Sequence, residues 1–342
     1  MTTPDWTVPL HDAGLAADPA TGTVLAFGGT ESTTDGGSAP STATRAWDGD
    51  LWRPVKSPVV PPGRQHPLLV SDAAAGRVLM LSGVSHHTQP VPPARSATRP
   101  TSAPSRLRRS DWLADAWTWS AGTWSPLLDV RSQVSGQISY HHDLGAPVLV
   151  GSVRNIVTGP AAVRVIAGTW RWDGTQWIAI SSAVPRYALT ALGYDPHGGR
   201  LVGLVARNPI NVNLPFSGTR RPLPAARPGT AEAWIFDGHA WHRDSALDPL
   251  DQASGVLAND PAGGHLVLIT ALGHTWALQD GEWQAVIGST SLPATVADPN
   301  ARLHAAAIPV GIVLVTTSTE AADQTWTFNG HEWRYHARRP SP

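Results

Sequence analysis

The chain has 342 residues, with 25 basic and 26 acidic side chains and a formal net charge of −1. Glycine (32 residues) and proline (31 residues) are frequent, which favours turns over long helices and predicts a β-rich chain. It contains no cysteine, which excludes disulfides, thiolate metal sites, iron–sulfur clusters and thiol nucleophiles. Residues 1–14 lack a signal-peptide pattern and no apolar run approaches membrane-spanning length, so we expect a cytoplasmic protein with no membrane partner.

Sixteen tryptophans accompany only four phenylalanines and four tyrosines, a bias that indicates a repeated motif. Pairs of tryptophans with six residues between them recur along the chain, and one unit has arginine in the first place. The pairs are Arg45/Trp52, Trp117/Trp124, Trp170/Trp177, Trp234/Trp241, Trp276/Trp283 and Trp326/Trp333. Each pair encloses a dipeptide such as Asp48-Gly49, which tolerates positive φ angles and predicts a hairpin with a two-residue turn.

A second hairpin is predicted before each pair, because apolar segments flank a turn there. These hairpins span residues 15–27, 68–81, 140–150, 191–205, 256–269 and 303–315. Six units of four strands with no helical periodicity predict an all-β fold, a six-bladed β-propeller of four-stranded antiparallel blades. We expect one domain over residues 1–342, with long inserted loops at about 85–112 and 206–231 on one face.

Three segments carry a resemblance to a kelch repeat: Phe27-Gly28-Gly29, Trp47-Asp48-Gly49 with Trp52, and Pro62-Gly63-Arg64-Gln65-His66. The resemblance covers roughly residues 10–336 and implies a propeller like the central domain of galactose oxidase. Only the first unit keeps the double glycine. Kelch propellers include peptide-binding scaffolds, copper radical oxidases, sugar epimerases and lyase-like specifier proteins, so the resemblance implies no single chemistry.

A second resemblance, at Tyr140-His141, concerns the copper-dependent chemistry of some kelch enzymes. Tyr140-His141 is similar to the tyrosine–histidine step of kelch copper oxidases, but those enzymes need a tyrosine cross-linked to cysteine and this chain has none. His141 and His142 are adjacent on a predicted strand and point to opposite faces, so the pair alone cannot chelate a metal. We therefore expect neither a metal nor another cofactor.

In kelch propellers the loop entering the innermost strand and the loop leaving the second strand open on the ligand-binding face. By this resemblance the candidate catalytic residues are Asp12, His66, His86, His87 and His304. The candidate ligand-binding residues are Arg64, Trp112, Gln137, Arg154, Arg186, Tyr187, Arg207, Ser254 and Arg302. Such groups suit acid–base catalysis or anion binding. The alternative is that they only satisfy the polar backbone of the loops.

Basic residues are concentrated in three connections, at residues 86–110, 153–168 and 206–231, which contain no acidic residue. The eleven arginines are Arg95, Arg99, Arg106, Arg108, Arg109, Arg154, Arg164, Arg207, Arg220, Arg221 and Arg227. We expect Arg64 and Arg302 to be exposed as well. Together with them, the arginines of these connections predict an anionic ligand. Alternatively, the insertions are solvated loops without a ligand. We expect both insertions to be mobile without a ligand, and deleting residues 88–108 should change the melting temperature little because it touches no strand. Nucleic acid is not an expected partner, because aromatic residues among these arginines are limited to Trp112.

The leading functional hypothesis is an enzyme or binding protein that takes a polar or anionic small molecule at the mouth of the ring, under the two long loops. As an enzyme of secondary metabolism it would move protons on that molecule without a cofactor, as an isomerase, cyclase or lyase does. The alternatives are an interaction scaffold that holds an acidic peptide on the same face and, third, a lectin. Most tryptophans occupy repeat positions and are expected to lie between blades rather than to stack on sugars. Trp6 lies outside the repeats, and whether it helps to close the ring is open.

Overall fold

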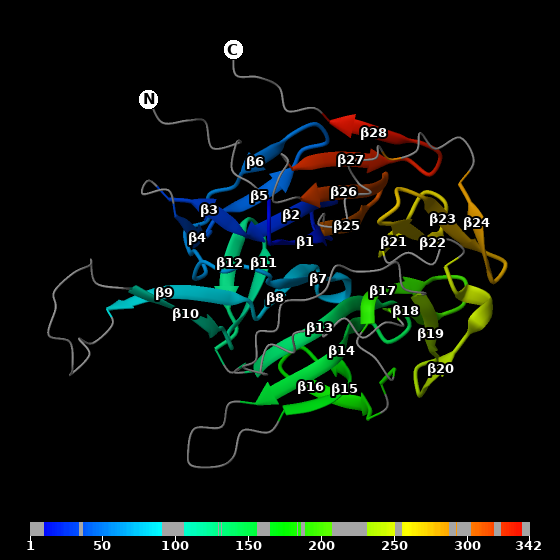
Figure 1. The fold of residues 1–342 in the computed structure, drawn as a ribbon, viewed down its shortest axis with the longest axis horizontal. Coiled ribbons are helices and arrows are strands. Elements are labelled where there is room, and N and C mark those ends of the chain that lie inside the picture. The colour runs from blue at the N-terminus through cyan, green and yellow to red at the C-terminus, as the bar shows by residue number, and fades with distance from the viewer. Residues whose placement is uncertain are drawn as a thin grey trace, which may run out of the picture.

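A computed structural model describes residues 10–33, 37–90, 106–128, 130, 132–155, 165–182, 184–185, 189–206, 231–249, 255–286, 292, 302–317 and 323–336. Six four-stranded antiparallel sheets are arranged as the blades of a β-propeller, which confirms the predicted fold class (Figure 1). Two short 3-10 helices, η2 (Ala73–Ala75) and η3 (Ser245–Leu247), follow strands of blades 2 and 4. No helix in these residues is long and apolar enough to span a bilayer.

The blades are numbered in chain order, and each uses a contiguous stretch of chain. Blade 1 contains β1 (Ala13–Asp18), β2 (Thr23–Gly28), β5 (Thr44–Trp47) and β6 (Trp52–Pro54). Blade 2 contains β7 (Leu68–Asp72), β8 (Arg77–Leu81), β11 (Ala116–Ser120) and β12 (Thr123–Pro126). Blade 3 contains β13 (Ser132–His141), β14 (Ala146–Asn155), β15 (Val165–Trp172) and β16 (Trp177–Ser181).

The remaining blades follow the same order of strands. Blade 4 contains β17 (Leu189–Asp195), β18 (Arg200–Ala206), β19 (Ala231–Phe236) and β20 (Trp241–Arg243). Blade 5 contains β21 (Gly255–Asp260), β22 (His265–Thr270), β23 (Thr275–Gln279) and β24 (Glu282–Ala285). Blade 6 contains β25 (Arg302–Ile308), β26 (Gly311–Thr317), β27 (Gln324–Phe328) and β28 (Trp333–His336).

The first strands of the blades line the ring axis, and β25 of blade 6 packs against β1 of blade 1. Both of these blades already have four strands from contiguous chain, so among the described residues the ring closes without an exchanged strand. The backbone N–H of Leu10 donates to Asp323 Oδ2 at 2.5 Å, which links the start of blade 1 to blade 6. Trp6 lies outside the described residues.

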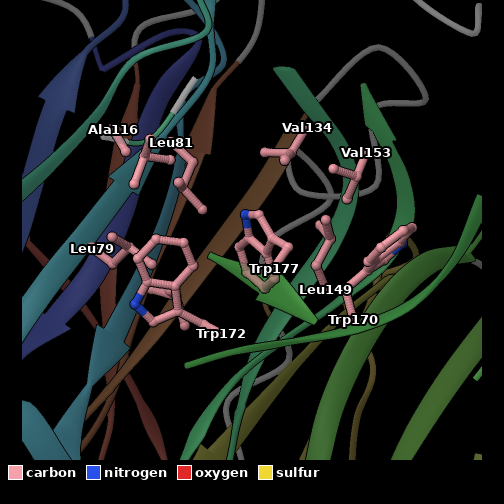
Figure 2. Close-up of a cluster of buried hydrophobic side chains, with 11 residues drawn as sticks. Leu79, Leu81, Ala116, Val134, Leu149, Val153, Trp170, Trp172 and Trp177 are labelled. Carbon is pink, nitrogen blue, oxygen red and sulfur yellow. The ribbon is translucent and has the colours of Figure 1, made fainter. Parts of the chain in front are cut away.

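The hydrophobic core lies between blades rather than inside them. Each main cluster of buried side chains draws its members from two neighbouring blades. Figure 2 shows the cluster between blades 2 and 3, where Leu79 and Ala116 of blade 2 belong to the same core as Leu149 and Trp177 of blade 3. Because a four-stranded blade has two faces to bury, each blade is stabilised by both neighbours, and the ring is the stable unit.

The second tryptophan of each repeat lies at an interface between blades. Four of these tryptophans donate the indole N–H to a threonine hydroxyl on the third strand of the preceding blade. The Nε1–Oγ1 distances are 3.0 Å for Trp52–Thr325, 2.9 Å for Trp124–Thr44, 2.7 Å for Trp241–Thr169 and 2.8 Å for Trp333–Thr275. These indoles hold blades together, which agrees with the structural interpretation of the repeat and leaves sugar stacking without support at these positions.

Two blades have alanine where the others have this threonine. In blade 2 this position is Ala116, which would face Trp177 of blade 3. The buried Nε1 of Trp177 has no hydrogen-bond partner among the described residues. Ala233 of blade 4 precedes the blade of Trp283, whose Nε1 donates instead to the carbonyl of Leu247 at 2.8 Å. One of the six inter-blade contacts therefore lacks a hydrogen bond that its counterparts have.

Replacing Ala116 with threonine is expected to raise the free energy of unfolding by about 1 kcal/mol, because the new hydroxyl supplies an acceptor for Trp177. Urea unfolding at equilibrium measures this change. Ala233→Thr is the matched control and should give no such gain, since Trp283 already has an acceptor. Equal losses of stability in both variants would show that crowding by the added atoms outweighs the hydrogen bond.

The outer hairpins turn in two ways. In blades 1, 3, 4 and 6 the connection between the two outer strands has four residues. The side-chain Oδ1 of the first of these residues accepts hydrogen bonds from the backbone N–H groups two and three positions later. The first residues are Asp48, Asp173, Asp237 and Asn329. In blades 2 and 5 it has two residues, Ala121-Gly122 and Asp280-Gly281, all at positive φ. The predicted two-residue turn is thus wrong for four blades, because the capping side chain stabilises a wider loop.

Two hairpin ribbons extend from the ends of blades 1 and 2, and their strands β4 and β9 lie next to each other. The first ribbon pairs β3 (Thr30–Ser32) with β4 (Ser38–Pro40). The second pairs β9 (Val84–Pro90) with β10 (Arg106–Trp112), and this second ribbon projects at the left of Figure 1. The insertion predicted as a loop at 85–112 is therefore partly strand, and deleting residues 88–108 would remove paired strand residues. Most of the insertion at 206–231 lies outside the described residues.

Candidate functional site

The loop entering β1 carries a buried carboxylate, that of Asp12. Its Oδ2 accepts a hydrogen bond from Thr30 Oγ1 at 3.0 Å and lies 2.9 Å from His11 Nδ1. Its Oδ1 lies 3.4 Å from Nδ1 of His66, which comes from the loop entering β7. Asp12 therefore joins groups from blades 1 and 2 at the face onto which both entering loops open.

Asp12 and His66 occupy equivalent positions in consecutive blades, and their backbones explain why they meet. Both have positive φ, 62° and 52°, and the His66 N–H donates to the Asp12 carbonyl at 2.8 Å. The adjacent Gly28 also has positive φ, and a Cβ on it would lie 2.4 Å from the Arg64 carbonyl oxygen. The double glycine of the first repeat thus permits the close approach of the two entering loops.

A chain of hydrogen bonds runs from Asp12 to the ribbon of blade 2. Gln65 Nε2 donates to Thr30 Oγ1, and Thr30 donates in turn to Asp12. Gln65 Oε1 lies 2.7 Å from Nε2 of His86, in β9. Because a carbonyl oxygen only accepts, His86 carries a proton on Nε2 in this chain of contacts.

Blade 6 contributes Arg302 and His304 from the start of β25. Arg302 is exposed, and its charge acts on both His304 and His66. The Nε2 atom of His304 is buried and has no hydrogen-bond partner among the described residues. The junction of blades 6, 1 and 2 thus holds a guanidinium and several imidazoles around one carboxylate.

The electrostatics keep two of these imidazoles neutral near pH 7. Burial lowers the pKa of His66; Asp12 opposes this shift, whereas Arg302 adds to it. Burial, followed by the charge of Arg302, lowers the pKa of His304 to about 4. Neutral imidazole retains a nitrogen lone pair that can accept a hydrogen bond or a proton.

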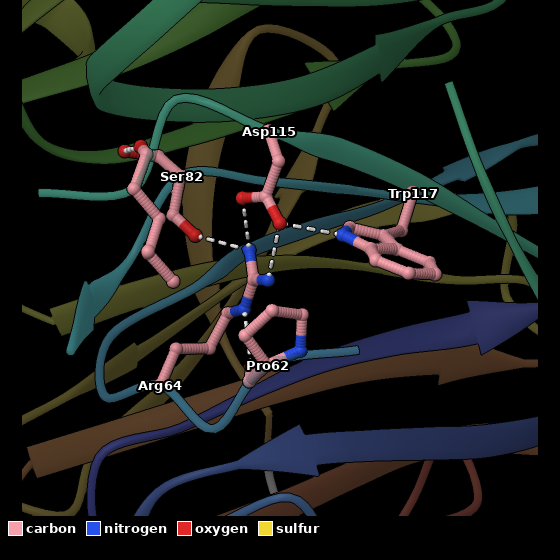
Figure 3. A network of polar contacts seen from close by, with 6 residues as sticks. Pro62, Arg64, Ser82, Asp115 and Trp117 are labelled. Atoms are coloured by element: carbon pink, nitrogen blue, oxygen red, sulfur yellow. Dashed lines mark hydrogen bonds and ion pairs between the residues drawn. The ribbon is translucent and has the colours of Figure 1, made fainter. Parts of the chain in front are cut away.

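Arg64 differs from the sequence-based expectation of an exposed ligand-binding residue. Its side chain is 0% exposed, and its guanidinium forms a bidentate pair with Asp115 at 2.9 and 2.8 Å (Figure 3). It also donates to the carbonyls of Ser82 at 2.9 Å and Pro62 at 3.0 Å, while Trp117 Nε1 donates to Asp115. Arg64 therefore fixes the loop that carries His66 and is not available as an open anion site.

The other sequence-predicted residues are not brought into this cluster. Gln137 pairs with Val150 in the middle of β13, whereas near the strand's start Gln133 donates to the Trp112 carbonyl at 2.6 Å and accepts from Arg154 at 3.2 Å. The side chain of His87 is not described, although its backbone is part of β9. Four further candidates lie outside the described residues: Arg186, Tyr187, Arg207 and Ser254.

The site also contains three residues that the sequence did not single out, His11, Thr30 and Gln65. Each is a sequence neighbour of a residue that did attract attention: His11 precedes Asp12, Thr30 follows the double glycine, and Gln65 precedes His66. Their roles depend on contacts between loops, which the repeat pattern does not encode. Among the described residues no three His, Asp or Glu side chains are placed to hold a metal ion.

No family model matches the chain, and no curated protein sequence does. The chain is a six-bladed β-propeller, and solved structures with low sequence identity show similar architecture. They include YjhT, at 12% identity over 80% of this chain and 83% of that chain, with a TM-score of 0.41. The SapL1 lectin in complex with alpha methyl fucoside is 12% identical over 96% of each chain, with a TM-score of 0.45.

A third similar structure is the β-propeller domain of the Trilobed protease from Pyrococcus furiosus, at 8% identity over 98% of this chain and 97% of that chain, with a TM-score of 0.43. At such identities and scores the likeness concerns the fold alone. The resemblance to kelch repeats remains a prediction from the sequence, and the chemistry has to be argued from the site.

Proposed function

We propose that the junction of blades 6, 1 and 2 binds an anionic small molecule and transfers protons on it without a cofactor, as an isomerase, cyclase or lyase does. The observation that supports this most is the pairing of a His66–Asp12 dyad with the exposed Arg302 at one face. Arg302 provides a fixed positive charge for a carboxylate or phosphate group. His66 provides a neutral nitrogen close to the bound molecule.

The dyad assigns a role to each group. Because Asp12 lies beside Nδ1 of His66, it holds the Nδ1–H tautomer and leaves the Nε2 lone pair to accept a proton. The Asp12 carboxylate would then stabilise the imidazolium that forms, as an orienting carboxylate does in other acid–base sites. A positioned general base of this kind typically contributes about 10²–10⁴-fold to a rate.

The experiment incubates the protein in D2O with a panel of small carboxylates and phosphates and follows each by proton NMR. We expect at least one anion to show line broadening from binding and loss of a carbon-bound proton signal by exchange. His66→Asn should lower the exchange rate by about 100-fold or more while leaving the broadening. His239→Asn, on the exposed outer hairpin of blade 4, is the control and should change neither.

The outcomes separate the two halves of the proposal. Binding without exchange would retain the anion site and overturn the catalytic role of His66. If no small anion binds and an acidic peptide does, the face is a protein-interaction surface and the enzyme hypothesis is wrong. Weaker binding at high salt should accompany a real anion site, because the Debye length falls from about 10 Å at 0.1 M to about 3 Å at 1 M.

A further inference from the structure

The donors and acceptors around Asp12 can be assigned atom by atom. Its carboxylate oxygens accept only, so the nearby nitrogens of His11 and His66 both carry protons, each on Nδ1. Whenever the ring is neutral, this proton is its only one, and the Nε2 atom is then an acceptor. Neither Nε2 has a hydrogen-bond partner among the described residues, although both side chains are partly exposed, by 26% for His11 and 47% for His66.

Arg302, the positively charged group of the site, requires hydrogen-bond acceptors from a ligand, whereas the imidazoles require donors. Arg302 donates only, and its exposed guanidinium forms no hydrogen bond or ion pair with the residues that the structure describes. Its planar fork matches the two oxygens of a carboxylate. A ligand that satisfies this face therefore has to present an oxyanion to Arg302 and O–H or N–H donors to the imidazoles.

We propose that the ligand is a hydroxylated carboxylic acid whose carboxylate pairs with Arg302 and whose hydroxyl groups donate to His66 and His11. This rests on the proposed anion site and narrows its substrate class. A hydroxyl suits the site better than an ammonium group. Arg302 repels a cation, and Asp12 already has Thr30, His11 and His66 around its oxygens. Unpaired acceptors in a partly desolvated site would discriminate against a ligand that has no donor.

Three four-carbon probes separate the contributions: L-tartrate has carboxylates and hydroxyls, succinate has carboxylates only, and L-threitol has hydroxyls only. Isothermal titration calorimetry at low salt should give tartrate at least 10-fold tighter binding than either of the others. Arg302→Gln should weaken tartrate binding at least 10-fold. Arg334→Gln is the matched control, since this arginine is on the exposed outer strand of the same blade and should have no effect.

The tautomers give a second readout that does not depend on affinity. Nitrogen-15 spectra of the imidazoles should show protonated Nδ1 in His66 and His11 and protonated Nε2 in His86. Asp12→Asn should alter the His66 pattern and abolish the preference for tartrate over succinate. Equal binding of tartrate and succinate, both sensitive to Arg302→Gln, would overturn the hydroxy-acid assignment and leave the anion site intact. Failure of all anions to bind would overturn both.

Discussion

Replacing Arg64 with alanine is expected to lower the free energy of unfolding by up to about 3–5 kcal/mol, the cost of removing one partner from a fully buried ion pair, because Arg64 is buried while Asp115 is 35% exposed. The side chain is fully buried, and its loss would remove both guanidinium hydrogen bonds from the Asp115 carboxylate, which would keep only the Trp117 donor, and the guanidinium donor from the Ser82 and Pro62 carbonyls. Arg64→Lys should recover only part of the loss, because an ammonium cannot reproduce the bidentate fork. Denaturant unfolding monitored by tryptophan fluorescence measures both changes.

A matched control is the exposed pair of Arg53 and Asp48 on the outer hairpin of blade 1. Arg53 Nε lies 2.5 Å from Asp48 Oδ2, but the Arg53 side chain is 63% exposed. Arg53→Ala should therefore cost no more than about 1 kcal/mol. If Arg64→Ala were equally mild, the buried network would not be what holds the His66 loop, and Arg64 would return as a ligand-binding candidate.

The comparison of Arg64 with Arg302 shows what a repeat can and cannot predict. The repeat aligns both arginines at the entry to an innermost strand, so it assigns them the same place; in the structure Arg64 lies in the loop before β7 and Arg302 is the first residue of β25. Arg64 differs because Asp115, which is 51 positions away in the sequence, lies beside it in the fold. The burial of a side chain depends on such distant partners. The position of a loop in a blade depends mainly on local turn and strand patterns, which the sequence contains.

Blade 3 shows a second limit, which concerns strand length. Placing Gln137 at the ligand face assumes that every innermost strand has the same number of residues before its turn. In the structure β13 spans Ser132–His141, so that Gln137 is in mid-strand and Gln133 lies nearer its start. The repeat could be aligned at its turns because tryptophan, glycine and aspartate mark them. No comparable residues mark the other ends of the strands.

Acidification is expected to lower the free energy of unfolding, with His304 as a main contributor. Its pKa is lowered from 6.5 to about 4 by burial and by Arg302, with His66 and His11 acting in the same direction and Asp12 opposing them. Between these two pKa values the unfolded chain binds a proton that the folded chain does not bind. Stability is therefore retained above pH 6.5 and lost as the pH falls towards 4.

The size of the pH effect on the free energy of unfolding follows from the shift in the pKa of His304. A change from 6.5 to about 4 corresponds to a loss of about 3 kcal/mol for His304 alone once the pH is below both values. His66, His141 and His336 also have pKa values lowered by burial, so they add in the same direction. Carboxylates begin to titrate in the lower part of this range, which is why the contribution of His304 has to be taken from a difference between variants.

Urea unfolding of the wild type and of His304→Gln between pH 7 and pH 5 isolates this contribution. Glutamine stays neutral throughout, so the variant should lose less stability on acidification than the wild type does, and the two curves should converge as the pH falls. The same substitution at the exposed His239 controls for the loss of an imidazole. Parallel curves for the wild type and His304→Gln would mean that His304 takes up a proton in the folded state as readily as in the unfolded chain. The imidazole would then be charged near Arg302 at mildly acidic pH, and an anionic ligand would bind there more tightly as the pH falls.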